Sequence, residues 1–241
     1  MRIVGIESMI VEIPLREPVT GVHGVTTVQQ SVLVRVQSDD GVEGWGDVDP
    51  TPGYTLESVD DIAAGAERLA VALRGGDPFN VQRALTLMDE TLGEAFEAKA
   101  AIEMALFDLK GKALGVPVHS LLGGRLVDEV FLNAWIGAVP PAQAAREAEE
   151  WAARGFITAK IKVSGAGPEG IERVAAVRAA VGSRMALRVD FNESLAPGEA
   201  VAFIERLVPY DLTLVEQPVP RDRIDALAEI RRRIDVPLMA D

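Results

Sequence analysis

Hydrophobic and polar residues alternate along the first 48 residues of the chain. The segments IVGIESMIVEIPL and QQSVLVRVQSDDGVEGWGD follow this two-residue period, which is typical of strands with one buried face. Asp40-Gly41 lies inside the second segment and predicts a tight hairpin turn. Helical spacing of the apolar residues then predicts helices over about 56–74, 79–92 and 95–114. We therefore expect an α+β unit over residues 1–125.

From residue 126 onward, short apolar runs alternate strictly with helical patterns. Strands are predicted at 130–137, 157–163, 185–190, 212–216 and 236–241, and helices at 141–154, 168–181, 197–208 and 224–234. Repeated strand–helix units of about 25 residues are typical of a parallel sheet, either a barrel or a doubly wound sheet. No GxGxxG motif follows the first strand of this region, which disfavours a dinucleotide-binding sheet.

Charged residues stand at the carboxyl ends of these predicted strands. Lys160 and Lys162 lie on one face of their strand because alternate side chains of a strand point the same way. The following strands end in Asp190, Glu216 and Asp241. Asp190 lies 28 residues after Lys162, Glu216 lies 26 after Asp190, and Asp241 lies 25 after Glu216. Because chemistry in a (β/α)8 barrel is carried at the carboxyl ends of the strands, we expect these side chains to gather around one mouth.

Three carboxylates without a histidine or cysteine partner are suited to a hard divalent cation. They predict a site for Mg²⁺, or for Mn²⁺, formed by Asp190, Glu216 and Asp241. Beside a cation and beside each other, Lys160 and Lys162 should have a lowered pKa, in the range that a general base needs. A carboxylate substrate held by the metal would then lose its α-proton through an enediolate.

Several motifs together resemble the muconate lactonising branch of the enolase superfamily. They are Lys160-Ile161-Lys162, Asp190-Phe191-Asn192, Glu216-Gln217-Pro218 and Leu238-Met239-Ala240-Asp241, with the phrases DGVEGWGD and AKAAIEMALFDLKGKALGVPVHSLLGG nearer the N-terminus. The resemblance covers the whole chain. It implies a magnesium-dependent enzyme that cycloisomerises, racemises, epimerises or dehydrates a small-molecule carboxylate, and that forms a homo-oligomer at full length.

The resemblance also implies a division of the chain and a role for each matching residue. Residues 1–125 would be a capping domain and residues 126–241 part of a barrel domain. Asp190, Glu216 and Asp241 match the family's metal ligands, Lys162 its base, and Lys160 the neighbour that tunes that base. Asn192 and Gln217 would orient the ligands. Substrate choice would lie in two loops, at about 16–30 and 48–57, where His23 and Tyr54 would touch the substrate.

The chain departs from the family pattern beyond Asp241. Only about five of the eight strands of a barrel are present, and the family's lysine on the sixth strand has no counterpart in this sequence. We therefore expect a C-terminally truncated version of a longer enzyme. We also expect residues 1–241 alone to be inactive, because open strand edges favour association.

Composition narrows the classes of partner. The chain has 24 Lys and Arg against 37 Asp and Glu, a net charge of -13, which disfavours nucleic acid and anionic membranes as partners. It has no cysteine, and it has neither a signal-peptide pattern nor an apolar run as long as a membrane span, so we expect a cytoplasmic protein. Two alternatives remain, a barrel aldolase that uses a lysine Schiff base and a non-catalytic fragment.

Overall fold

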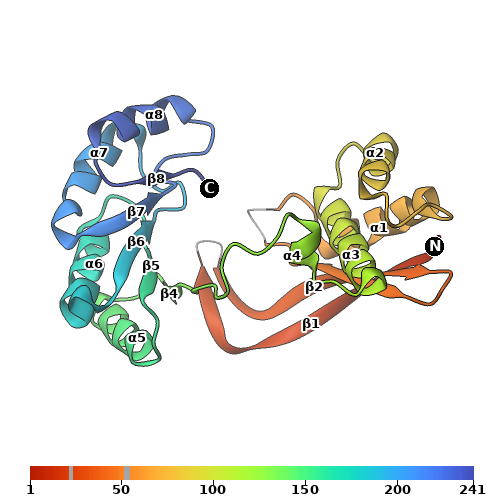
Figure 1. Cartoon of the computed structure of the whole chain (residues 1–241). Helices are drawn as coiled ribbons and strands as arrows, with labels where there is room; N and C mark the ends of the chain where they lie inside the picture. The colour runs from red at the N-terminus through yellow and green to blue at the C-terminus, as the bar shows by residue number, and fades with distance from the viewer. Residues whose placement is uncertain (22–23, 52–54) are drawn as a thin grey trace. The chain divides into compact units, whose positions relative to one another are not determined.

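The protein consists of two compact units, each with its own sheet and its own helices. The computed structural model describes residues 1–21, 24–51 and 55–241. The first unit comprises Met1–Val19 and His23–Asp128, and the second comprises Thr20–Val22 and Glu129–Asp241. Figure 1 labels the elements of both. Within the described ranges, no helix has both the length and the apolar character needed to cross a membrane.

The first unit is a three-stranded sheet with helices packed on it. The strand order is β1-β2-β3. The strands are β1 (Ile3–Gly21), β2 (Gly24–Ser38) and β3 (Glu43–Val48), and the helices are α1 (Val59–Leu73), α2 (Val81–Thr91), α3 (Phe96–Leu114) and α4 (Val118–Leu121). The predicted hairpin is confirmed, because β2 and β3 pair antiparallel on either side of the turn that contains Gly41. The predicted α+β character of this region is therefore confirmed.

The core of the first unit follows from the two-residue period of β2. Val32, Val34 and Val36 are fully buried, and the residues between them are partly exposed. Helix α3 packs on the neighbouring strand at Gly44 and Gly46. A Cβ at either glycine would collide with a backbone carbonyl oxygen of α3. Glycine at both positions is therefore required for the close packing of α3 on β3.

The second unit is a parallel sheet with a helix after each of its first four strands. The strand order is β4-β5-β6-β7-β8, and every neighbouring pair is parallel. The strands are β4 (Ala134–Ile136), β5 (Thr158–Lys162), β6 (Ala186–Asp190), β7 (Leu212–Glu216) and β8 (Leu238–Met239). The helices are α5 (Pro141–Ala153), α6 (Pro168–Val181), α7 (Pro197–Glu205) and α8 (Ile224–Arg233), with short 3-10 turns at Gly182–Arg184 and Val208–Tyr210. All four helices lie on one side of the sheet (Figure 1).

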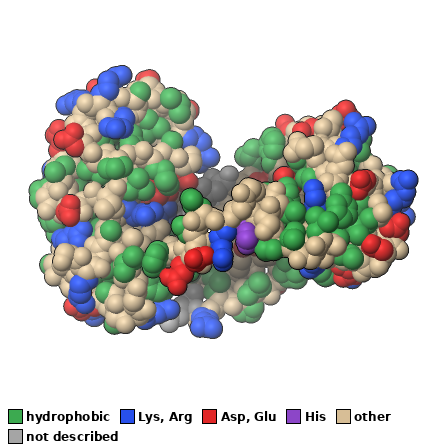
Figure 2. All heavy atoms as spheres, in the orientation of Figure 1, with side chains coloured by type: hydrophobic (Ala, Val, Ile, Leu, Met, Phe, Trp, Pro, Cys, Tyr) green, Lys and Arg blue, Asp and Glu red, His purple; other side chains and the backbone are tan. Residues whose placement is uncertain are grey.

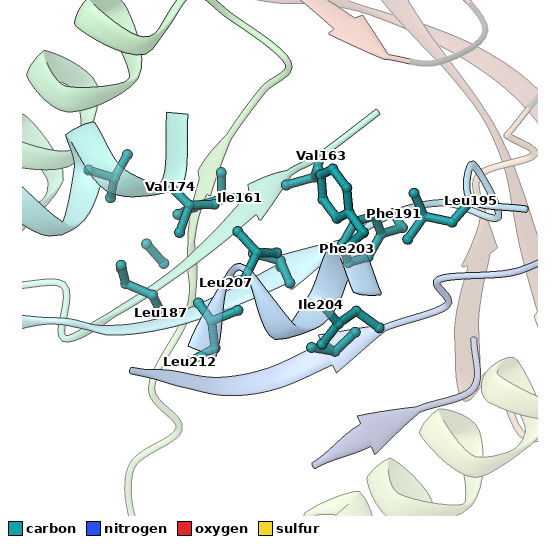
Figure 3. Close-up of a cluster of buried hydrophobic side chains, with 14 of the residues drawn as sticks. Ile161, Val163, Val174, Leu187, Phe191, Leu195, Phe203, Ile204, Leu207 and Leu212 are labelled. Carbon is teal, nitrogen blue, oxygen red and sulfur yellow. The ribbon is translucent and has the colours of Figure 1, made fainter. Parts of the chain in front are cut away.

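Apolar side chains fill the space between this sheet and its helices. Ile161 on β5, Leu187 on β6 and Val174 on α6 are fully buried in one cluster, which Figure 3 shows in close-up. Phe191 and Phe203 meet edge to face within it, with ring centroids 5.7 Å apart. On β5 the buried residues alternate with the lysines, so the lysines point to the face that the helices do not cover.

Two predicted strands are clearly shorter than expected. The strand at 236–241 is observed as β8 (Leu238–Met239), and the strand at 130–137 loses its first residues. Residues 130–133 were expected to belong to a strand at 130–137, but β4 begins only at Ala134, and Val130, Phe131 and Leu132 are 69–80% exposed. The pairing explains this difference. Ala134 lies opposite Ala159 on the parallel strand β5, so residues 130–132 would lie opposite residues 155–157, which come before β5 begins and offer no strand to pair with.

Hydrophobic and charged side chains are interspersed on the face of the protein that Figure 2 shows.

Candidate active site

The carboxyl ends of three neighbouring strands bring the charged residues to one level. Lys162 on β5 lies opposite Asp190 on β6, and Asp190 lies opposite Glu216 on β7. Lys160 stands one pleat earlier on the same face of β5 as Lys162. The parallel register thus places side chains from three separate segments of the sequence side by side.

Two lysines and two carboxylates form one ion-pair network at this level. The Lys160 Nζ lies 2.6 Å from Glu216 Oε1 and 2.9 Å from Asp190 Oδ2. The Lys162 Nζ lies 2.6 Å from the same Asp190 oxygen and donates to Asn192 Oδ1 at 2.7 Å. The Asp190 side chain is fully buried and that of Glu216 is 3% exposed, whereas the two lysines retain 19–24% exposure. Buried carboxylates are tolerated here because each has an ammonium partner.

The network shifts the pKa values of Lys160 and Asp190. Burial, the largest single influence, works to lower the pKa of Lys160, but its hydrogen bonds to Glu216 and Asp190 outweigh burial and raise it. Burial works to raise the pKa of Asp190, but hydrogen bonds from Lys162, Lys160 and the Asn192 backbone lower it. Direct contact with two carboxylates thus favours the charged form of Lys160, whereas the lowered pKa expected from the sequence applies to a site that holds a cation.

The residues that follow the strands fix the backbone at this edge of the sheet. The Asn192 backbone N–H donates to Asp190 Oδ1 at 2.9 Å. Gln217 is buried, and its side chain donates to the Val219 carbonyl and accepts from the backbone N–H of Asp241 at 2.8 Å. Both Asn192 and Gln217 have a positive φ, which is uncommon for residues with a side chain. The Asn192 backbone and the Gln217 side chain thus hold the strand ends in place.

The oxygen donors of this edge fit a hard divalent cation in their chemistry, and two of them lie together. Asp190 and Glu216 are neighbours in register and share Lys160 as a partner. Asp241 is attached to the edge through its backbone, and its side chain is exposed. Within residues 1–21, 24–51 and 55–241, no group of three His, Cys, Asp or Glu side chains is arranged to hold a metal. The structure therefore brings together two of the three proposed ligands.

The structure also reveals contacts that the sequence did not suggest. Glu193 accepts from the Nε of Arg221 at 2.6 Å, which joins the loop after β6 to the loop after β7. The Ser194 hydroxyl accepts from the Gly165 N–H at 2.9 Å, which joins the loop after β5 to the loop after β6. Both residues directly follow the Asp190-Phe191-Asn192 motif, and this adjacency was the only sequence signal for them. The two proposed substrate contacts, His23 and Tyr54, lie outside the described residues.

Two family models match nearly all of the chain. Residues 5–123 match the model described as the mandelate racemase/muconate lactonizing enzyme N-terminal domain, and residues 143–241 match the one described as enolase C-terminal domain-like. These matches bear out the resemblance drawn from the motifs.

Relatives with different activities are about equally similar to the chain. It is 33% identical to an N-succinyl-L-Arg/Lys racemase of Bacillus cereus, 34% to a hydrophobic dipeptide epimerase of Enterococcus faecalis and 32% to a muconate cycloisomerase of Rhodococcus opacus. The alignments cover 95–100% of this chain but only 65–66% of those proteins. The chain thus spans about two thirds of the length of these curated relatives.

A solved structure shares the fold over the whole chain. The crystal structure of a dipeptide epimerase from Enterococcus faecalis, complexed with Mg and the dipeptide L-Leu-L-Tyr, has a TM-score of 0.96 at 33% sequence identity. It matches 100% of this chain, which covers 68% of that one. An enolase-like fold is therefore established for the present chain.

Proposed function

Because the chain belongs to the mandelate racemase and muconate lactonizing enzyme family, we propose that its site removes the proton α to the carboxylate of a small molecule. The protein would act as an isomerase or a lyase. The observation that carries this proposal is the register of Lys162, Asp190 and Glu216 across three adjacent strands, with Lys160 in the same ion-pair network. Lysines and carboxylates from separate segments of the sequence converge there on one edge of the sheet.

Asp190 and Glu216 would hold Mg²⁺ or Mn²⁺, with Asp241 as the third ligand. Carboxylate oxygens suit such hard cations. When bound, the cation supplies positive charge that offsets the negative charge developing on the substrate. The structure of the Enterococcus faecalis epimerase in complex with Mg supports this choice of cation by analogy.

Lys162 would take the proton at its Nζ. Asp190 and Asn192 contact this atom at 2.6 and 2.7 Å and thereby fix its direction. Lys160, which points to the same face of β5, would be the neighbour that tunes this base. Gln217 would hold Asp241 in position through the Asp241 backbone N–H.

The division of labour along the chain completes the proposal. Residues 1–125 would be the capping domain and residues 126–241 the barrel domain. His23 and Tyr54 would contact the substrate, and their loops would decide which carboxylate is accepted. The relatives act on substrates as different as dipeptides, succinylated amino acids and muconate, so these compound classes form the panel to test.

Exchange of the substrate α-proton with deuterated solvent tests the proposal. The protein expressed from its natural gene should catalyse this exchange on one panel member in the presence of Mg²⁺, and Lys162→Ala should abolish exchange on one face of the α-carbon. Lys112→Ala, which removes a half-exposed lysine of the first unit, is the matched control and should retain exchange. Mass spectrometry or proton NMR measures the deuterium incorporated.

Two outcomes would contradict the assignment. Exchange by Lys162→Ala at the wild-type rate would remove Lys162 from the role of base. Trapping of a covalent adduct at Lys160 or Lys162 by borohydride with a carbonyl compound would instead support the Schiff-base alternative.

A further inference from the structure

The end of β5 extends beyond its neighbour on one side. Strand β4 ends at Ile136, opposite Ile161, while β5 continues to Lys162. On the other side, the Val163 N–H donates to the Asp190 carbonyl at 2.9 Å. Because the C=O and N–H of a trans peptide point in opposite directions, the Lys162 carbonyl points to the β4 side. No residue of β4 is left there to donate to it.

Arg173 of helix α6 provides the missing donor. Its Nη1 donates to the Lys162 carbonyl at 3.0 Å, and its Nε donates to the carbonyl of Val139, in the segment that leaves β4. Its Nη2 donates to Glu169, one turn earlier on the same helix, at 3.2 Å. The side chain is only 4% exposed. The planar guanidinium thus links the end of β5 to the segment after β4, where the two strands no longer pair with each other.

Close packing of α6 on β5 allows this arrangement. A Cβ at Gly170 would lie 2.5 Å from Cγ1 of Val163, so a larger residue would push the helix away from the strand. Val163 directly follows Lys162 and is 1% exposed. The same turn of α6 therefore contacts the Val163 side chain at Gly170 and the Lys162 carbonyl through Arg173.

A second arginine of the same helix offers a matched comparison. Arg178 donates to the carbonyls of Gly182, Met185, Tyr210 and Asp211 at 2.6–3.0 Å. Met185 and Asp211 directly precede β6 and β7, so this cluster lies at the amino ends of the strands. Helix α6 thus holds backbone carbonyls at both ends of the sheet, and only Arg173 holds one that belongs to a proposed catalytic residue.

We propose that Arg173 is a positioning residue for Lys162: by holding the Lys162 carbonyl, it fixes the point from which the lysine side chain reaches Asp190 and Asn192. This inference rests on the proposed function in so far as Lys162 is the base. Arg173 would thus influence the reaction through Lys162, without contacting the substrate or the metal itself. A misplacement of about 1 Å in a reacting group can cost about a hundredfold in rate.

The test compares three variants of the protein expressed from its natural gene: Arg173→Met, Arg173→Lys and Arg178→Met. Four quantities are compared. They are kcat and KM for α-proton exchange and the hydrogen-exchange rate of the Val163 amide, all measured well below the melting temperature of each variant, and the melting temperature itself. We expect both methionine variants to lower the melting temperature, because each leaves buried carbonyls without a donor.

Only the Arg173 variants should change the chemistry. We expect Arg173→Met to lower kcat by about tenfold to a hundredfold with little change in KM, and to speed exchange of the Val163 amide. Arg173→Lys should also lower kcat, because a single ammonium cannot reproduce the planar fork on two carbonyls. Arg178→Met should keep the wild-type kcat.

The contradicting outcomes are equally specific. Wild-type kcat in Arg173→Met, or an equal loss of kcat in Arg178→Met, would reduce Arg173 to a stabilising role. If Arg173→Met does not fold, wild-type kcat in Arg173→Lys overturns the inference. If the wild-type protein exchanges no α-proton at all, the proposed function fails. In that case the hydrogen-exchange rate of the Val163 amide tests whether Arg173 positions Lys162. An unchanged rate in the Arg173 variants overturns the inference.

Discussion

At the scale of single residues, Glu216 is the cleanest probe of the proposed metal site, because its strand partner and its ion pair are both defined. Glu216→Gln keeps the shape of the side chain but removes the charge, so it should weaken Mg²⁺ or Mn²⁺ binding more than about tenfold. Glu205→Gln, an exposed change of the same kind at the end of α7, is the control. Titration calorimetry that gives equal affinities for wild type and Glu216→Gln would remove Glu216 from the ligand set.

A second residue-scale prediction concerns two acids of the first unit. Burial, the largest influence, and the neighbouring carboxyl of Glu97 raise the pKa of Glu57 to about 7. Because this folded-state pKa lies above the ordinary glutamate value of 4.5, the stability linked to Glu57 is fully present below pH 4.5. That stability is lost as the pH rises through about 7.

Glu57→Gln removes this titration. It should raise the melting temperature relative to wild type at pH 8 and change it little at pH 5. The control is Glu67→Gln, which makes the same change at an exposed position of α1. A difference between Glu57→Gln and wild type that stays constant from pH 5 to 8 would show that Glu57 does not titrate there.

At the scale of secondary-structure elements, the packing of α3 on β3 depends on two glycines. Gly46→Ala should destabilise the first unit by about 2–4 kcal/mol, because the new methyl group collides with the Ala101 carbonyl of α3. Gly198→Ala is the control, since a Cβ there meets no atom within 4 Å, and a helix position tolerates alanine well. Urea denaturation followed by circular dichroism measures both, and equal midpoints would contradict the predicted collision.

The accuracy of the sequence predictions also varies by element. Helix α6 and strand β7 have the predicted bounds, 168–181 and 212–216, because a strong period and clear end signals coincide there. Strand β4 was predicted too long, since hydrophobicity at 130–132 says nothing about whether a partner strand lies opposite. The positions of Lys160, Lys162, Asp190 and Glu216 at strand ends could be predicted from spacing alone. Their ion pairs, and the contacts of Arg173, could not be predicted because they depend on register and helix packing.

At the scale of the whole molecule, two separate hydrophobic cores are present. Leu106 is fully buried in the core of the first unit, and Leu187 in that of the second. Leu106→Ala and Leu187→Ala should each destabilise their own unit by about 2–5 kcal/mol through lost burial and a residual cavity. Hydrogen exchange followed by mass spectrometry should then show faster exchange mainly in the mutated unit. Equal acceleration in both units for both variants would mean that the chain unfolds as one cooperative body.

The alternation of lysine and isoleucine along β5 has a consequence for how the chain avoids wrong structures while it folds. If β5 paired one residue out of register, every side chain would change faces. Lys160 and Lys162 would then enter the apolar layer under α6, and Ile161 would leave it. An ammonium without a partner in such a layer costs several kcal/mol. The free energy of the misregistered sheet is therefore much less favourable than it would be for an all-aliphatic strand. Lys162, which is proposed to take the proton, and its neighbour Lys160 thus also disfavour the wrong strand register, and replacing both lysines would remove this effect together with the proposed chemistry.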